Sequence, residues 1–482
     1  MNRTAKLLGI VIVATALAAG WLPPGVAQAD EQHYLIVAKG NGFSEDFEAA
    51  VRAAGGVVER KMSAIGVALA HSTDPGFAAK ASAISELEAV VPELTLEMVD
   101  PWGAEALAQA DASRRSPCSE DLSYLQWGLD AIHAREAWAA AALAGMPGAR
   151  GAGARVVVLD GGIDLTHPDL SPNVNFELSC SLVDDEPLQY QPIGPIPFAH
   201  GSATAGIIAA AGDGAGVLGV APEAEIVHVK VLRDRTGSAS SGVVMAGLYY
   251  AAQIGADVVN MSLAGYRTRS GWAGNPADPS SVFVGADVIA AHLKAYTRAT
   301  QYAHERGVTM IAAAANDAVD RDHTADLVVV PGDLPHVIQV SATGPIGWAS
   351  DPNTNLDLPA PYTGYGQSRV DLAAPGGFSP YPHPLNAFWP FDSKLRKVPS
   401  WAFDLVLVAD HDGGWCWASG TSFAAPHAAG VAALIIATHG GALHPDQVRA
   451  ILQESADDLG KPGNDDFYGA GRVNALRAVL QK

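Results

Sequence analysis

The sequence contains few cysteines and few basic residues for its length. Three of its 482 residues are cysteine, and 30 lysines and arginines stand against 51 aspartates and glutamates, giving a formal net charge of −21. This shortage of positive charge argues against nucleic acid and anionic lipid as partners. The cysteines, Cys118, Cys180 and Cys416, are too scattered to indicate a cysteine metal site.

Long apolar runs are missing after the N-terminus, and no later segment resembles a membrane span. At the start, positive residues precede the apolar run 7–22, which is followed by Ala27-Gln28-Ala29. This order is typical of a secretory signal peptide, here residues 1–29, and the run is too short for a membrane anchor. We therefore expect a secreted or periplasmic protein. The 49% apolar and 17% charged composition predicts a large globular core.

The segment 420–430 (GTSFAAPHAAG) places Ser422 where a loop meets the apolar run 431–437. Pro426 suits the first turn of a helix, where its missing N–H has no cost. The positive end of such a helix favours negative charge that develops near the hydroxyl. Ser422 is thus a candidate nucleophile, although a lone serine at this position would more often cap the helix.

A serine nucleophile needs a base, and the base needs an orienting acid. Residues 155–159 (RVVVL) indicate a buried strand that ends at Asp160, within the segment 160–170 (DGGIDLTHPDL). His200 follows at the start of 200–206 (HGSATAG). Taken separately, Asp160 could be a loop cap and His200 a structural histidine.

Together these segments resemble the motifs of the subtilisin-like serine peptidases, or subtilases: VxVxDSGIxxxHPDL, HGTHVAG and GTSMAxPHVAG, in that order. The resemblance implies an α/β, three-layer subtilisin-like fold with a mostly parallel sheet. It also implies that Asp160 orients His200, that His200 deprotonates Ser422, and that the protein hydrolyses peptide bonds through an acyl-enzyme. The expected partners are peptide or protein substrates, and no cofactor is required for the chemistry.

Two further segments resemble the family's substrate-binding motifs. Residues 309–317 (TMIAAAAND) resemble the AAxGN box, which implies that Asn316 donates a hydrogen bond to the oxyanion. Residues 256–265 (ADVVNMSLAG) resemble the strand VINMSLGG, whose end pairs with an extended peptide. The implied substrate-binding residues are Ser262, Leu263, Ala264 and Ala315.

Four of the departures from the family motifs bear on function. Gly161 replaces a Ser or Thr and so removes a hydrogen-bond donor beside the Asp160 carboxylate, and Ala203 replaces a second histidine. Ala264 and Ala315 replace glycines, which puts methyl groups beside the substrate side chain and penalises bulky residues there. These departures motivate an alternative function, a catalytically weak or inactive peptide-binding module with the same fold.

The region before the motifs predicts a separate small domain. We expect strands at 33–39, 55–60, 65–70 and 94–99, and helices at 44–54 and 78–87. This β-α-β-β-α-β order is typical of a ferredoxin-like fold, and by resemblance residues 30–101 are an inhibitory propeptide. The alternative is a binding module that the mature protein retains. Residues 102–122 form an Ala-rich polar linker where processing is easiest, and 123–482 form the catalytic domain.

The remaining predictions concern a metal, two insertions and the cysteines. Many relatives bind calcium through the HPDL aspartate and a loop after the base helix, which implies Asp169 and Asp213 as oxygen ligands. Asp213 alternatively only forms a turn. Segments 266–281 and 377–417 are expected to be inserted loops that shape access. We expect a monomer, with Cys118–Cys180 as the preferred disulfide.

Overall fold

The computed structural model describes residues 31–97, 121–194, 198–274, 281–324, 326–378, 389–391, 394–396, 400–441 and 443–481. The predicted signal peptide, most of the predicted linker and Cys118 lie outside these residues. The linker was predicted to extend to residue 122, but Leu122 is buried and its N–H donates to Gly216 O at 2.8 Å. The second domain therefore begins earlier than the sequence indicates.

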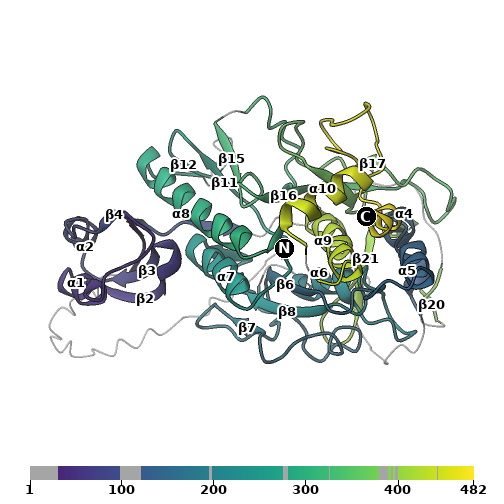
Figure 1. Cartoon of the computed structure of the whole chain (residues 1–482), viewed down its shortest axis with the longest axis horizontal. Helices are drawn as coiled ribbons and strands as arrows, with labels where there is room; N and C mark the ends of the chain where they lie inside the picture. The colour runs from purple at the N-terminus through teal and green to yellow at the C-terminus, as the bar shows by residue number, and fades with distance from the viewer. Residues whose placement is uncertain are drawn as a thin grey trace, which may run out of the picture.

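The N-terminal domain is a four-stranded antiparallel sheet with two helices, at the left of Figure 1. Its elements are β1 Gln32–Ala38, α1 Phe47–Ala53, β2 Val57–Met62, β3 Val67–Ser72, α2 Phe77–Ala81 and β4 Leu87–Pro92, with strand order β2-β3-β1-β4. The order of elements agrees with the prediction. The last strand of the sheet differs from the predicted one, because Leu87 and Val90 pack into the core of the domain and make 87–92 a strand where the end of a helix was expected.

The segment predicted as that last strand leaves the small domain. Its residues form β5 Thr95–Glu97, which pairs antiparallel with β9 Ser238–Ser240 of the large domain. Leu96 is fully buried and lies in the same apolar cluster as Leu263. The small domain is thus tied to the large one by a strand pair.

The large domain is built on an eight-stranded sheet with the order β17-β16-β14-β10-β6-β8-β7, and β18 pairs with β16. The strands are β6 Arg155–Asp160, β7 Cys180–Ser181, β8 Glu225–Lys230, β10 Val258–Met261, β14 Thr309–Ala313, β16 Val337–Gly344, β17 Leu358–Pro359 and β18 Leu372–Pro375. All of these pairings are parallel except that of β17 with β16.

Strand alternation divides the core into two layers. In β6, Val156 and Val158 face one apolar cluster, whereas Val157 and Leu159 face the other. The first layer holds α4 Trp127–Ala131, α5 Ala134–Leu143, α6 His200–Ala209, α9 Thr421–Thr438, α10 Pro445–Ser455 and α11 Ala475–Leu480. The second holds α7 Ser241–Gln253 and α8 Ala286–Glu305, on the side that faces the small domain (Figure 1). This is the predicted three-layer α/β architecture.

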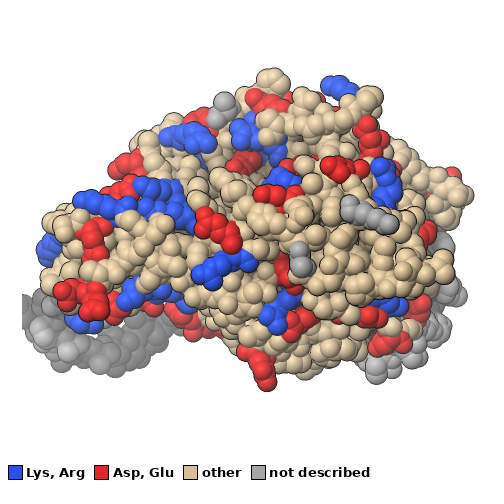
Figure 2. Space-filling view, viewed as in Figure 1, with Lys and Arg blue, Asp and Glu red and all other residues tan. Residues whose placement is uncertain are grey.

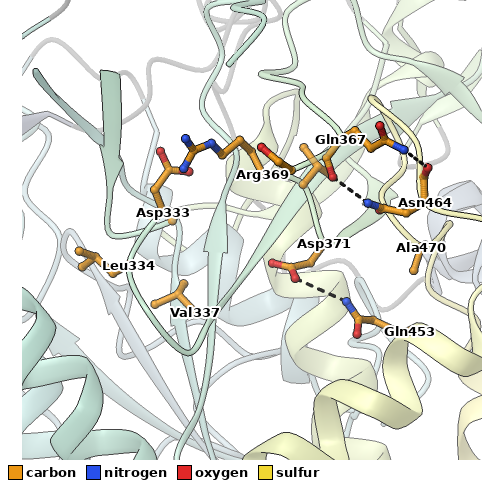
Figure 3. Close-up of a pocket in the computed structure, with 12 residues that line it drawn as sticks. Asp333, Leu334, Val337, Gln367, Arg369, Asp371, Gln453, Asn464 and Ala470 are labelled. Atoms are coloured by element: carbon orange, nitrogen blue, oxygen red, sulfur yellow. Dashed lines mark hydrogen bonds between the residues drawn. The ribbon is translucent and has the colours of Figure 1, made fainter. Parts of the chain in front are cut away.

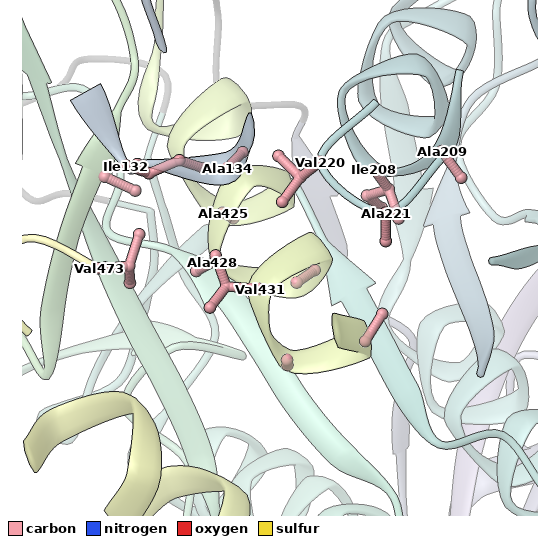
Figure 4. Packing of buried hydrophobic residues seen from close by; sticks show 14 of the residues in the cluster. Ile132, Ala134, Ile208, Ala209, Val220, Ala221, Ala425, Ala428, Val431 and Val473 are labelled. Carbon is pink, nitrogen blue, oxygen red and sulfur yellow. The ribbon is translucent and has the colours of Figure 1, made fainter. Parts of the chain in front are cut away.

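Helix α9 is the centre of the first layer. All of its side chains are buried, and Ala425, Ala428 and Val431 pack beside Ile208 and Val220 (Figure 4). Within the described residues it is the one helix long and apolar enough to cross a membrane. Its complete burial accounts for that apolar composition, because a helix that is hydrophobic all round fits the core of a large domain.

The two segments predicted as inserted loops are more ordered than expected. The first contributes to a small sheet of β11 Gly265–Thr268, β12 Trp272–Ala273, β13 Val282–Phe283 and β15 Leu327–Val330. The second forms the hairpins β19 Trp389–Phe391 with β20 Lys394–Arg396, and β21 Val406–Ala409 with β22 Trp415–Ala418. Trp401 and Trp417 are buried in the core, so these two tryptophans are packing residues.

Charged side chains of both signs are interspersed over the face drawn in Figure 2.

Candidate active site

Ser422 is the second residue of α9, and its surroundings explain the local sequence. Gly420 has φ 155°, and a Cβ there would lie 3.2 Å from Asn316 Nδ2, so a side chain would crowd the site. Pro426 was expected in the first helical turn but lies within the helix. Because Pro426 has no N–H to donate four residues back, the carbonyl of Ser422 instead accepts a hydrogen bond from Ser262 Oγ at 2.7 Å.

The Ser422 hydroxyl lies against the end of β10. Its Oγ donates to the carbonyl of Ser262 at 3.3 Å, and Asn260 Nδ2 donates to Ser262 Oγ at 3.0 Å. All three side chains are buried. The predicted nucleophile and the predicted substrate-binding strand are therefore in direct contact.

Asp160 and His200 form a buried pair between β6 and α6. Asp160 is the last residue of its strand and His200 the first of its helix, and Asp160 Oδ1 lies 2.8 Å from His200 Nδ1. Burial alone raises the pKa of the Asp160 carboxyl, but His200 and the 2.6 Å hydrogen bond from Gly161 N–H outweigh it and lower the pKa below its ordinary value. Asp160 is thus an anion at neutral pH.

The other nitrogen of His200 is left for the reaction. Nε2 is buried and makes no hydrogen bond to any residue that the structure describes. The imidazole ring lies 5.5 Å from the ring of Phe423, the residue next to Ser422. Catalytic hydrogen bonds are often long without substrate and shorten when it binds. The structure thus places His200 beside the residue that follows Ser422, whereas the Ser422 hydroxyl donates to Ser262 O.

The donor that Gly161 lacks is supplied from α6, which the sequence interpretation missed. Thr204 Oγ1 donates to Asp160 Oδ2 at 3.0 Å. The other carboxylate oxygen, Oδ1, contacts His200 and accepts from Gly161 N–H. Both oxygens of Asp160 are therefore hydrogen-bonded. Thr204 follows His200 by four residues, and residues i and i+4 share a helix face. That spacing is the signal that could have identified it.

His228, whose side chain contacts the carbonyl oxygen of Gly161, was not predicted from the sequence either. His228 lies on β8, and its Nε2 is 2.7 Å from Gly161 O. A Cβ at Gly201 would lie 2.7 Å from His228 Cε1, so glycine after His200 leaves room for this ring. Burial lowers the pKa of His228, which keeps the imidazole neutral. Gly161 is therefore fixed through its N–H and its carbonyl.

Asn316 follows β14 and faces the start of α9. Its Oδ1 accepts hydrogen bonds from Thr421 N at 2.9 Å and from Thr421 Oγ1 at 2.8 Å. With Oδ1 engaged in this way, Nδ2 is directed toward Gly420, the residue before the serine turn. An amide N–H in this position can donate to an oxygen that becomes negative beside Ser422.

Apolar side chains fill the space between the ends of β10 and β14. Ala264 and Ala315 form a buried cluster with Val329, and Tyr266 packs against it. Tyr266 pairs with Val329 across β11 and β15, a contact that the sequence could not indicate because the small sheet was not predicted. Ala315 has φ 73°, a region that costs a residue with a Cβ of the order of 1 kcal/mol. The space beside Ser262 and Asn316 therefore holds extra side-chain volume.

The environment of Asp169 does not fit a calcium ligand. Its Oδ2 accepts hydrogen bonds from Val217 N and Trp415 Nε1, both at 2.8 Å, and these N–H groups lie where a cation would need to approach. Asp213 is exposed, and its Oδ1 accepts from Ala215 N in a turn. Calcium at Asp169 and Asp213 stays a prediction that this donor set does not favour.

A cavity of about 540 Å³ lies elsewhere, between the segment after β15, β18 and α10. Figure 3 shows its polar lining: Gln367 and Asn464 are bonded to one another, and Asp371 accepts from Gln453. Neither the predicted triad nor Asn316 lines it. It is therefore not the candidate reaction site.

Comparison with known proteins identifies the family of the large domain. The model of the subtilase family matches residues 151–471, the part of the chain that holds Asp160, His200 and Ser422. The chain belongs to the subtilase family. This subtilase is 29% identical to thermitase from Thermoactinomyces vulgaris, over 76% of this chain and 99% of that protein. It is 32% identical to subtilisin Savinase from Lederbergia lenta, over 69% and 93%.

The fold is shared with a solved structure that spans nearly the whole chain. The epidermin leader peptide processing serine protease (EpiP) from Staphylococcus aureus superposes with a TM-score of 0.68 at 21% identity, covering 94% of this chain and 99% of that one. The protein is therefore a serine peptidase of the subtilase family, and its separate sheet at 32–92 is consistent with a propeptide.

Proposed function

We propose that this subtilase is a secreted endopeptidase in which Asp160, His200 and Ser422 form the catalytic triad. The observation that carries the proposal is the buried 2.8 Å contact of Asp160 with His200, whose other nitrogen is unpartnered among the described residues beside the start of α9. Burial strengthens each charge interaction there, because the local dielectric is low.

The reaction follows from the chemistry of these groups. His200 Nε2 takes the proton of Ser422 Oγ as that oxygen attacks the carbonyl carbon of the peptide bond. Asn316 Nδ2 and the backbone N–H of Ser422 donate to the resulting oxyanion. The imidazolium, held by Asp160, gives its proton to the leaving amine, and water then hydrolyses the acyl-enzyme by the same route.

We also propose that the N-terminal domain inhibits the enzyme before processing. This is supported by β5, an extended segment that occupies the strand edge of β9 as a peptide substrate would. Leu96 side-chain atoms lie 3.0 Å from where a Cβ of Gly265 would stand, three residues beyond Ser262. Arg267 donates to Thr95 O at 2.6 Å. These contacts hold β5 beside the strand end that contacts the Ser422 hydroxyl, and we expect cleavage C-terminal to Glu97.

A fluorophosphonate probe tests the enzyme against the inactive-module alternative. Processed wild-type protein should be labelled on Ser422, and Ser422→Ala should remove the label without changing the circular dichroism spectrum. Processed, folded wild-type protein that takes no label would support the peptide-binding module instead.

Maturation gives a second test, on the size of the purified chain. In a host without other proteases, Ser422→Ala should accumulate as the pro-form with an N-terminus near Asp30, whereas the wild type should lose residues through at least Glu97. Intact-mass measurement decides between them. Equal trimming of both proteins would show that processing is not self-cleavage.

A further inference from the structure

Three histidines and one aspartate from distant parts of the chain meet at the surface. His304 lies in the last turn of α8, His336 directly precedes β16, His444 caps α10 and Asp446 lies in its first turn. Asp446 joins two of them, because its Oδ1 is 2.9 Å from His304 Nε2 and its Oδ2 is 3.4 Å from His444 Nδ1. The elements that carry His336 and Asp446 are joined directly, because Arg449 of α10 donates to Val337 O at the start of β16 at 2.8 Å.

The imidazole rings of this cluster are packed closely together. The rings of His304 and His336 stack with centroids 3.8 Å apart, and His444 meets His304 edge-on at 4.9 Å. His336 is held at φ 68°, a backbone region that a residue with a side chain rarely adopts and that is frequent at functional sites.

We propose that His304, His444 and Asp446 bind a divalent transition-metal ion such as Zn²⁺. In this site His336 fixes the orientation of the His304 ring by stacking on it. One ligand atom from each of the three residues lies within 4.8 Å of the others. Two imidazole nitrogens and one carboxylate oxygen are a donor set that zinc prefers, with water completing four-coordination. Calcium and magnesium prefer oxygen ligands and would not select this cluster.

The position of the cluster predicts what the ion does. It joins the end of α8 to the beginning of α10, elements that are more than a hundred residues apart in the sequence. An ion that binds the folded chain and not the unfolded one stabilises the fold, by an amount that grows with the logarithm of the free ion concentration relative to Kd. The Asp446 and His444 side chains are 66% and 52% exposed, so the ion can reach them from solvent.

The test is zinc titration of the full chain carrying Ser422→Ala, which prevents self-digestion, prepared without a polyhistidine tag. We expect calorimetry to give one Zn²⁺ per chain with micromolar affinity, and saturating Zn²⁺ to raise Tm. His444→Asn retains a side chain that can cap α10 but removes the imidazole, and should weaken binding at least about tenfold, since it removes one of three protein ligands. Asp446→Asn should do the same. Each should lose the rise in Tm.

The matched control is His323→Ala. His323 is an exposed histidine that contacts one carboxylate, that of Asp320 at 2.8 Å, and does not belong to the three-residue cluster. Zinc binding should be unchanged by this substitution. Titration with Co²⁺ in place of zinc should give the visible absorption of a tetrahedral site in the parent and not in His444→Asn. Absence of binding below millimolar zinc, or equal binding by parent and His444→Asn, would overturn the proposal.

Discussion

The candidate active site has two sides, one around Asp160 and one around Asn316, and the departures from the family motifs have different surroundings on each. On the side of Asp160, the hydroxyl that Gly161 lacks is replaced by Thr204, which donates to the same carboxylate at 3.0 Å. On the side of Asn316, Ala315 replaces glycine, and its surroundings add further volume through Val329 and Tyr266. The hydrogen bond lost at Gly161 is thus replaced by a neighbouring side chain, whereas the volume added at Ala315 is increased further by its neighbours.

This difference indicates which property each side controls. The contacts of Asp160 retain what an orienting acid needs: burial, a fixed carboxylate and a hydrogen bond to His200. The cluster at Ala264 and Ala315 retains an orientated Asn316 but leaves less space for a substrate side chain. Substitutions of Asn316 or of the contacts of Asp160 should therefore change the rate for every substrate, and substitutions in the cluster of Ala264 and Ala315 should change which substrates are cleaved.

The largest effect is expected at Asn316. Asn316→Ala removes the side-chain donor to the oxyanion and should lower kcat by roughly 10² to 10³, a range taken from subtilisin itself. KM should change little, because this hydrogen bond strengthens in the transition state. Steady-state kinetics on one peptide checks the prediction. A fall in kcat of less than about threefold would exclude Asn316 as an oxyanion donor.

The next effect concerns how the binding of the N-terminal domain to the large domain depends on pH. Glu93 is half-buried beside the start of α7, and its Oε1 accepts a hydrogen bond from Gly242 N at 2.8 Å. Burial raises the pKa of Glu93 to about 7, from an ordinary value of 4.5. Arg267, His292, Tyr296 and Glu59 are the other titratable groups around this contact.

Because the docked state holds the Glu93 proton more tightly than the released state, docking is strongest below pH 4.5 and weakens as pH rises to about 7. Release of the cleaved N-terminal domain should therefore become up to about a hundredfold more favourable across that window. Glu93→Gln, which cannot ionise, should flatten the dependence. The measurement is the appearance of activity with time between pH 5 and 8. A wild-type profile that falls with pH would contradict this sign.

A smaller loss is expected from removing the substitute hydroxyl. Thr204→Val keeps the shape of the side chain but cannot donate to Asp160, and hydrogen bonds to charged groups contribute about 1.5–3 kcal/mol. Since Asp160 keeps its other donors, we expect kcat to fall about tenfold to thirtyfold with KM unchanged.

Thr204→Ser is the matched control, because it keeps the hydroxyl and should retain most of the rate. The pH profile of kcat separates a positioning role from a structural one, since only the former shifts the limb that reports His200. If Thr204→Val and Thr204→Ser lose rate equally, the hydroxyl is not what holds Asp160.

The sequence predicted the fold where a local pattern is sufficient and missed contacts between segments far apart. The strands ending at Asp160 and Asn316 were predicted because buried apolar runs end there at polar residues. His228 was not predicted, since its contact with Gly161 depends on β8 lying beside β6. The strand predicted at 94–99 was expected to pair within the small sheet, but residues 95–97 pair instead with β9, about 140 residues away in the sequence.

The smallest effect should appear at Ala315 as a change in selectivity. Ala315 lies at φ 73°, which glycine adopts without strain, and its methyl group belongs to the cluster with Ala264 and Val329. Ala315→Gly should therefore relieve both backbone strain and crowding. Overpacking by one or two carbons costs typically about 1–3 kcal/mol, so wild type should cleave after small or medium aliphatic residues in preference to large aromatic ones.

Reversion should raise kcat/KM for a peptide with Phe before the cleaved bond, relative to one with Ala, by on the order of tenfold if the crowding is fully relieved. Asn316 is retained in this variant, so the rate on the Ala peptide serves as an internal control for the chemistry. Tyr266→Ala should move the same ratio in the same direction, because Tyr266 packs on the same cluster. If neither variant changes the ratio, selectivity is set by other surfaces around the site, and the two sides of the active site are less distinct than their contacts indicate.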